Sequence, residues 1–342
     1  MKKKRPSFGR YLLRRVLLLI PLLIGVLFIT FMVIRIGDSN PAVLIAGPTA
    51  TAAEIQAIEQ DLGLDRPLLT QFGRYVSDVV RGDFGESWLT RRTVVEELKD
   101  RLPITLELIT IGTIAAILFG LAVGLLSALT KDRIPDQVLR FGTLLGISMP
   151  IFWLGLLLIF LFFSTWQIAP GPIGRVDILI RLPERVTGFL LIDSALAGNW
   201  EAFRSVLEHL ALPTVTIMLV TGATIAKQTR AAIVEIRNSS PVRYARASGL
   251  PNRLIWRMSV HNALPTIITF TAIAYSLGLG GSALVELIFS WGGMGQLGLE
   301  GITKTDFAIV QAYVLAMGVI VSVVYLLADM LVALIDPRVV YR

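Results

Sequence analysis

The stretch Val242-Arg-Tyr-Ala-Arg-Ala-Ser-Gly-Leu250, followed after a short interval by Asn262-Ala-Leu-Pro265, lies between two long apolar segments of the chain. Its arginines alternate with small residues, and Gly249 offers a position at which the backbone can turn tightly. A chain embedded in a membrane has little reason to place so many arginines on one face unless a partner is bound there. We therefore expect this stretch to bind a cytoplasmic partner.

The composition indicates an integral membrane protein. Apolar residues make up 54% of the 342 residues, and the mean hydropathy of +0.70 is far above the value of soluble proteins. The net charge of +7 would also suit nucleic acid, but basic residues clustered at membrane edges are better explained by orientation in the bilayer. We therefore expect no nucleic-acid partner, and the absence of cysteine excludes disulfides and thiolate chemistry.

Six segments are apolar enough to cross about 30 Å of hydrocarbon, which takes about 20 residues of helix. The predicted fold is therefore all-α, a polytopic membrane protein with six transmembrane helices. The first apolar run is too long for a signal peptide, so we predict an uncleaved span. The predicted segments are a tail at residues 1–10, a transmembrane domain at 11–342, spans at about 11–35, 104–130, 137–168, 209–236, 262–289 and 307–335, an external insertion at about 36–103, and a cytoplasmic loop at about 237–262.

The basic residues predict the orientation. If the N-terminus is cytoplasmic, the cytoplasmic segments hold most of the 32 Lys and Arg residues but only four acids, Asp132, Asp136, Glu235 and Asp336. This asymmetry is the positive-inside pattern, and it requires an even number of spans. We therefore predict that both termini are cytoplasmic.

The external insertion contains two segments with helical periodicity. Apolar residues recur along one face over Ala52 to Leu62 and again over Leu68 to Val80. We predict short helices there, lying over the outer membrane surface. A second external stretch, from Gln167 to Glu208, has breaks at Pro170-Gly-Pro172 and Gly188 and little other pattern.

The residues that could carry catalysis do not form a site. Gly146-Ile-Ser148 resembles the Gly-x-Ser of an intramembrane serine protease, but His209 and His261 lie at predicted span ends on opposite sides. The chain has no His-Glu-x-x-His zinc motif and no phosphate-binding loop. We therefore assign no catalytic, cofactor or metal residue, and any energy for transport must come from another chain.

Small and ionisable residues mark positions inside the spans. Gly120 and Gly124 form a Gly-x-x-x-Gly pair, for which packing within the chain is favoured over a subunit contact or a hinge. We expect Asp329 to pair with a basic group near the inner face, because no ladder of carboxylates accompanies it. The candidate cavity-lining or hinge residues are Gly278, Gly280, Gly281 and Glu286.

Five ordered motifs resemble the permeases of ABC importers, in the dipeptide and oligopeptide branch of the binding-protein-dependent family. Val242 to Leu250 with Leu264-Pro265 resembles the EAA loop of that branch. The other motifs are Gly63-Leu-Asp-Arg-Pro67 with Gln71 and Gly82-Asp-Phe-Gly-Glu-Ser87, Ser148-Met-Pro-Ile-Phe-Trp-Leu-Gly155, Glu286-Leu-Ile-Phe-Ser-Trp-Gly-Gly-Met-Gly-Gln-Leu297, and Asp336-Pro-Arg338 with Tyr341. Because these motifs run from the first external region to the last residues, the resemblance covers the whole chain.

Three details depart from the family pattern. The Glu-Ala-Ala triad falls on Arg243-Tyr244-Ala245, so the glutamate is absent, as is usual in the peptide branch. Gly292-Gly293 stands where the family has Pro-Gly, and the histidine common in the loop is shifted to His261. The order of the loop motif is unaffected.

The resemblance implies a type I ABC importer permease fold and a permease subunit in a bacterial inner membrane, not an enzyme. Its partners would be a second homologous permease, two cytoplasmic P-loop ATPases that bind ATP and Mg, an external solute-binding protein, and membrane lipid. The substrate would be a di- or oligopeptide, with nickel chelates, glutathione and oligosaccharides left open. The implied ATPase-coupling residues are Arg243, Tyr244, Ala245, Arg246, Ala247, Gly249, Leu250, Arg253, Arg257, Leu264 and Pro265.

Three alternatives stay open at this point. Contact with anionic lipid would explain the charge of the arginines but not the ordered run Ala245-Arg-Ala-Ser-Gly-Leu250. An ion-coupled carrier or channel would need a selectivity filter or matched charges in repeated halves, and neither is visible. An intramembrane protease would depend on Ser148.

Overall fold

The computed structural model describes residues 8–36, 41–47, 49–61 and 63–335. Most of the predicted tail and the C-terminal motif Asp336 to Arg338 with Tyr341 lie outside these residues. In the described part of the chain the regular structure is helical, apart from one isolated bridge between Glu86 and Thr93. The elements are α1 (Phe8–Ile36), α2 (Pro41–Ala46), α3 (Ala52–Asp61), α4 (Leu68–Val80), α5 (Val94–Leu129), α6 (Ile134–Ser148), α7 (Ile151–Leu158), η1 (Ile159–Thr165), α8 (Leu190–Leu196), α9 (Trp200–Arg237), α10 (Ser240–Ala247), α11 (Asn252–Ile288), α12 (Met294–Thr303) and α13 (Phe307–Ile335).

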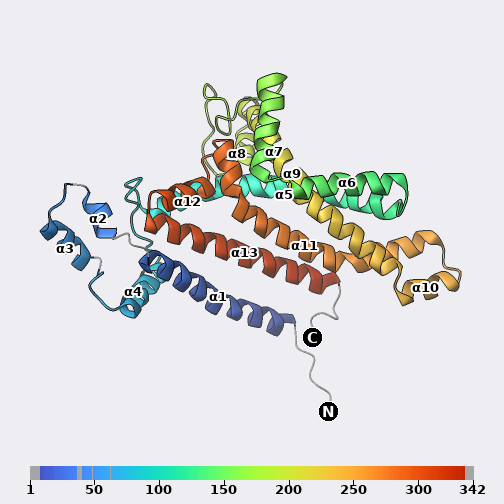
Figure 1. Ribbon diagram of the computed structural model, residues 1–342, viewed down its shortest axis with the longest axis horizontal. Helices are drawn as coiled ribbons and strands as arrows, with labels where there is room; N and C mark the ends of the chain where they lie inside the picture. The colour runs from blue at the N-terminus through green and yellow to red at the C-terminus, as the bar shows by residue number, and fades with distance from the viewer. Residues whose placement is uncertain (1–7, 37–40, 48, 62, 336–342) are drawn as a thin grey trace, which may run out of the picture.

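Among the described residues, five helices are long and apolar enough to cross a membrane, or six if the bent pair formed by α6 and α7–η1 is one span. The five are α1, α5, α9, α11 and α13. Figure 1 shows α1 alongside α13, with α2 to α4 at one end of the molecule and α10 at the other. The all-α polytopic fold predicted from the sequence is confirmed.

Several helices extend beyond the predicted spans. α5 begins ten residues before the expected start, because Thr93 and Glu96 form a capping box in which each side chain accepts from the other's backbone N–H. α9 and α11 likewise begin before their predicted spans, in the more polar sequence that precedes each apolar run. Hydropathy marks the buried length of a span, whereas backbone hydrogen bonding continues into the water on either side.

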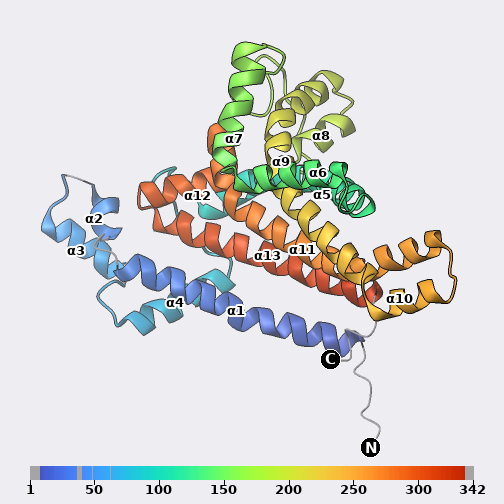
Figure 2. The same ribbon diagram turned by 45° about the vertical axis from the view of Figure 1, so that its right-hand side comes forward.

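The third predicted span, at 137–168, is not one straight helix. α6 and α7–η1 meet at an angle of 103°, and Figure 2 shows α7 standing away from the line of α6. The break falls at Met149-Pro150, where Met149 has an extended ψ of 126°. Proline lacks an N–H donor and disfavours helical backbone in the residue before it, so the chain turns there.

α5 and α9 form the most closely packed pair of long helices. A Cβ atom on Gly120 would lie 2.7 Å from the Cβ of Ile225, and one on Gly124 would lie 2.7 Å from the carbonyl oxygen of Ala226. On the facing helix, a Cβ on Gly222 would lie 2.8 Å from Phe119. The preferred interpretation of the Gly-x-x-x-Gly pair, packing within the chain, is therefore confirmed by the geometry.

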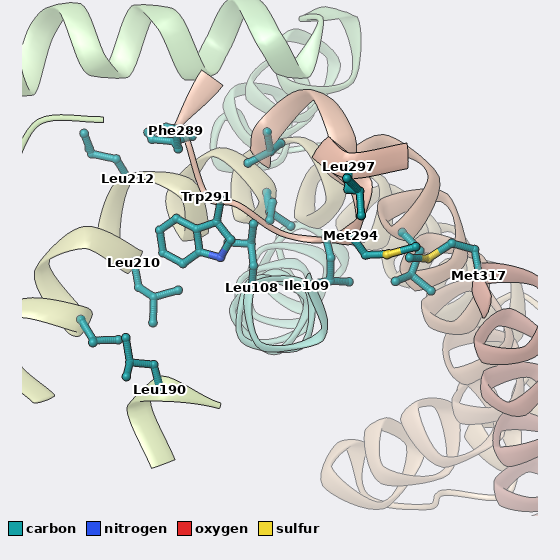
Figure 3. Close-up of a cluster of buried hydrophobic side chains, with 14 of the residues drawn as sticks. Leu108, Ile109, Leu190, Leu210, Leu212, Phe289, Trp291, Met294, Leu297 and Met317 are labelled. Atoms are coloured by element: carbon teal, nitrogen blue, oxygen red, sulfur yellow. The ribbon is translucent and has the colours of Figure 1, made fainter. Parts of the chain in front are cut away.

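The main apolar core lies where α5, α9, α11 and α12 meet. Figure 3 shows Trp291 between the side chains of Leu210 and Leu108, with Met294 and Leu297 on the other side of α5. Trp291 is only 2% exposed and belongs to the predicted motif Glu286 to Leu297. That motif therefore forms the corner that joins α11 to α12 and covers α5.

The segment predicted as an external insertion contains both of its predicted helices, α3 and α4, with nearly the predicted bounds. α4 lies against α1 through Phe72, whose ring contacts Phe28 and Phe31. Further along, the Ser87 hydroxyl donates to Asp306 Oδ2 at 2.6 Å. Because Asp306 also accepts from the backbone of Ile309 at the start of α13, this contact joins the insertion to the last helix.

Candidate functional site: an exposed basic hairpin

The candidate site is the hairpin formed by residues 237–257, which we call the basic hairpin. It comprises the end of α9, all of α10 and the first turns of α11. α9 and α11 contain 38 and 37 residues, so each is about 55 Å long at 1.5 Å per residue. A hydrocarbon layer of about 30 Å cannot cover such helices. The hairpin therefore projects from one end of the helix bundle (Figures 1 and 2).

The C-terminus of α10 is fixed by a Schellman motif. The N–H of Gly249 donates to the carbonyl of Arg246 at 3.1 Å, and the N–H of Leu250 donates to the carbonyl of Ala245 at 3.2 Å. Gly249 has a φ of +78°, in the left-handed region that glycine adopts without cost. A Cβ there would meet nothing within 4 Å, so the requirement for glycine comes from the backbone conformation and not from lack of space.

α10 buries one face and exposes its charge. Val242 and Ala245 are buried, whereas Arg243 and Arg246 are exposed and Tyr244 is 77% exposed. The exposed set continues through Ala247 and Gly249, and Leu250 is half-buried. The apolar positions three residues apart hold the helix to the bundle, and the arginines and the tyrosine face outward.

The first turns of α11 add two more exposed arginines. Arg253 and Arg257 are exposed and lie one turn apart, while Ile255 and Ser259 between and after them are buried. In the described part of the chain no carboxylate lies within 4 Å of any of the four guanidinium groups, those of Arg243, Arg246, Arg253 and Arg257. Their charge is therefore not neutralised by a carboxylate of the residues that the structure describes.

The base of the hairpin is packed firmly. The guanidinium carbon of Arg237 lies 3.9 Å from the centre of the Trp256 ring, which joins the end of α9 to the start of α11 by a cation–π contact. Below it, Ala128 of α5, Ile233 of α9 and Ala263 of α11 form a buried cluster. These contacts join the hairpin to both long helices.

Leu264 and Pro265 lie inside α11, in agreement with the span predicted at 262–289, and not in the exposed part of the hairpin. The chain returns to helix at Asn252, so both residues are half-buried and about two turns beyond the hairpin. The predicted loop ends near residue 262, but the residues before that point are already helical from Asn252 onward. The predicted coupling residues thus divide into an exposed set and this pair within α11.

The candidate cavity or hinge residues also fall into two places. Gly278, Gly280 and Gly281 lie on α11, which is continuous through them, and a Cβ on any of the three would meet nothing within 4 Å. Gly280 lines a groove of about 530 Å³ between α1, α11 and α13. At the end of this groove Arg15 and Asp329 form an ion pair at 3.0 Å, so the expected basic partner of Asp329 is confirmed.

Glu286 is fully buried and does not line that groove. Its Oε1 accepts from the Thr105 hydroxyl at 2.6 Å, and its Oε2 accepts from the N–H of Gln296 at 2.9 Å. The Thr105 oxygen in turn accepts from the N–H of Met294 at 2.8 Å. We call these contacts the Thr105–Glu286 lock, because they hold α5, α11 and α12 together.

One buried ion pair near the hairpin was not predicted from the sequence. Asp136, at the start of α6, is 0% exposed and receives Nε and Nη2 of Arg230 on α9, both at 2.7 Å. Ser127 and the N–H of Asp132 also donate to its oxygens. From the sequence alone, Asp136 is one of the four acids of the cytoplasmic segments and has no predicted partner. The signal for the ion pair is Arg230, because a charge within a helical span needs a partner.

Comparisons with known proteins cover almost the whole chain. Residues 120–341 match the family model described as the binding-protein-dependent transport system inner membrane component, and residues 8–109 match the N-terminal model of the same transport systems. The chain is 40% identical to the probable D,D-dipeptide transport system permease protein DdpB of Escherichia coli K12, over 97% of this chain and 98% of that protein. It is 36% identical to the di/tripeptide transport system permease protein DppB of Pseudomonas aeruginosa, over 96% and 98%.

A further relative has a different substrate in its name. The chain is 34% identical to the glutathione transport system permease protein GsiC of Salmonella paratyphi A, over 97% of this chain and 99% of that protein. These matches favour a transport permease over the carrier, channel and protease alternatives.

Proposed function

Because the chain belongs to the family of binding-protein-dependent transport system inner membrane components, we propose that it is the permease subunit of an ATP-driven importer of di- or oligopeptides. The substrate class rests on relatives named for D,D-dipeptides and for di- and tripeptides that match it end to end. Glutathione, the substrate in the name of another relative, is itself a small peptide. The strongest support for this function is the similarity to these relatives over 96–97% of the chain.

The basic hairpin is the element that we assign to ATPase coupling. It presents Arg243 and Arg246 beside the exposed ring of Tyr244, and arginine and tyrosine are among the residues enriched at the centres of protein interfaces. Contact with anionic lipid would account for the charge of the arginines but not for the ordered run Ala245-Arg-Ala-Ser-Gly-Leu250. The guanidinium groups of these arginines can pair with carboxylates or with helix C-termini on a cytoplasmic ATPase.

Movement of the hairpin would then drive transport. Closure of two ATPases around ATP and Mg would shift α10, and the stacked Arg237 and Trp256 would carry that shift to α9 and α11. Rigid helices of about 55 Å act as levers, so the cavity would alternate between outward-facing and inward-facing states. No covalent chemistry is required of this chain.

The remaining subunits follow from the same premise. A second homologous permease would complete the cavity, and an external solute-binding protein would deliver substrate on the side opposite the hairpin. The concentration of arginines at the hairpin end favours a cytoplasmic position for that end and for both termini. Gly278, Gly280 and Gly281 stay candidates for the cavity or for the permease contact, since they face open space.

The direct test is affinity purification of the tagged protein from its native membrane, with mass spectrometry of the co-purifying chains. We expect a second permease and two P-loop ATPases with the wild-type protein. The variant Arg243→Glu with Arg246→Glu should retain the second permease but lose the ATPases. The matched control, Arg81→Glu with Arg181→Glu, reverses two exposed arginines of the external segments and should retain both. ATPase recovery that is equal in all three proteins would overturn the coupling role.

A further inference from the structure

A second groove opens between α5, α6 and α9, next to the Asp136–Arg230 ion pair. Its volume is about 220 Å³, and its lining combines Val123 and Ser127 of α5 with Arg140 and Leu144 of α6 and Lys227 of α9. Figure 1 shows the turn between α5 and α6 on the same side of the molecule as α10. The groove is therefore at the hairpin end of the helix bundle.

The charge of this groove is positive and uncompensated. Arg140 and Lys227 are both exposed, and neither has a carboxylate within 4 Å in the described part of the chain. Arg230, the third cation of the lining, is neutralised by Asp136 through two hydrogen bonds of 2.7 Å. Two basic side chains from different helices thus remain for an external anion.

The shape of the groove selects an amphiphilic anion. The lining beside the cations is mostly apolar, with Ser127 and Thr143 as its hydroxyl side chains. The same face of α6 continues with Leu144, 53% exposed, and Ile147, 38% exposed, one turn later. Such leucine and isoleucine side chains favour acyl chains over water. A small soluble anion would use the cations only, whereas a phospholipid would use both parts.

We propose that this groove binds an anionic phospholipid, with the phosphate held by Arg140 and Lys227 and the acyl chains along α6. Basic pockets between helices at the membrane surface have the chemistry for such headgroups, and an arginine fork matches a phosphate in two hydrogen bonds. The bound lipid bridges α6 to α9, beside the Asp136–Arg230 pair. It therefore braces the helix that carries the basic hairpin.

The test measures lipid retained by the full-length chain. Protein is released from nanodiscs of equal phosphatidylglycerol and phosphatidylcholine and analysed by native mass spectrometry. We expect phosphatidylglycerol adducts on the wild-type protein and about 30-fold weaker retention in Arg140→Gln with Lys227→Gln, since each basic residue contributes about fivefold. Arg133→Gln is the matched control, because Arg133 is exposed on the same turn but does not line the groove; it should retain lipid as the wild type does.

Two results would overturn the proposal. Equal retention in all three proteins would mean that the anionic lipid is attracted diffusely by surface charge. Displacement of the lipid by inorganic phosphate would mean that the groove binds a soluble anion. If the double variant does not insert, the single variants Arg140→Gln and Lys227→Gln should each lose about fivefold, and unchanged retention in both refutes the site. Lipid retention needs neither ATPase nor substrate, so this test is independent of the proposed transport function.

Discussion

Replacing Thr105 by valine tests the Thr105–Glu286 lock with almost no change in side-chain shape. The hydroxyl that is lost donates to Glu286 Oε1 at 2.6 Å and accepts from the N–H of Met294 at 2.8 Å. Thr105 is 0% exposed, so water cannot replace either contact. Each buried polar group left without its partner costs about 1–3 kcal/mol, so the two lost contacts predict a decrease of about 2–6 kcal/mol in the free energy of unfolding.

The assay is reversible unfolding of the purified protein in mixed micelles, followed by tryptophan fluorescence. Thr269→Val is the matched control, because Thr269 is exposed and bonds only to its own helix at Pro265; it should stay within about 0.5 kcal/mol of the wild type. A cycle that adds Glu286→Gln should show non-additive losses. A Thr105→Val protein as stable as the Thr269→Val control, or strict additivity in the cycle, would refute the lock.

Three further predictions concern the packing around the hairpin. Gly120→Ala should lower the free energy of unfolding by about 1–3 kcal/mol, since its Cβ would lie 2.7 Å from Ile225, whereas Gly142→Ala has open space and should be neutral in the same unfolding assay. Asp136→Ala should lower the free energy of unfolding by about 2–3 kcal/mol. This is less than the loss expected for a fully buried ion pair, because the Arg230 side chain is 20% exposed. A decrease of less than about 0.5 kcal/mol would contradict the interpretation as a buried pair. Gly249→Val places a β-branched residue at a φ of +78°, which costs about 1–2 kcal/mol of conformational free energy. This variant should reduce ATPase co-purification while membrane insertion is unchanged.

The local features of the fold could be predicted from the sequence. The short helices α3 and α4 follow from apolar residues at helical spacing, and the tight turn at Gly249 follows from glycine placed after a basic helix. These features depend on neighbours within a few residues. The five family motifs could also be recognised from the sequence alone, because their order along the chain can be read without knowing any contact in space.

The contacts that hold the helices together could not be predicted in this way. Thr105 and Glu286 are 181 residues apart, and Asp136 and Arg230 are 94 residues apart. Their pairing depends on how the helices pack, which one sequence does not encode in any local pattern. The bend at Met149-Pro150 could not be predicted for the same reason. Pro103 and Pro213 lie inside unbroken helices, so only the tertiary context decides which proline ends a helix.

The coupling role of the basic hairpin can be measured as ATP-driven uptake of a labelled dipeptide into proteoliposomes that contain the purified permeases and ATPases, supplied with the solute-binding protein. We expect accumulation that requires ATP and is abolished by Arg243→Glu with Arg246→Glu. Accumulation without the ATPases, or undiminished uptake by the double variant, would contradict the claim that the basic hairpin couples this permease to ATP hydrolysis.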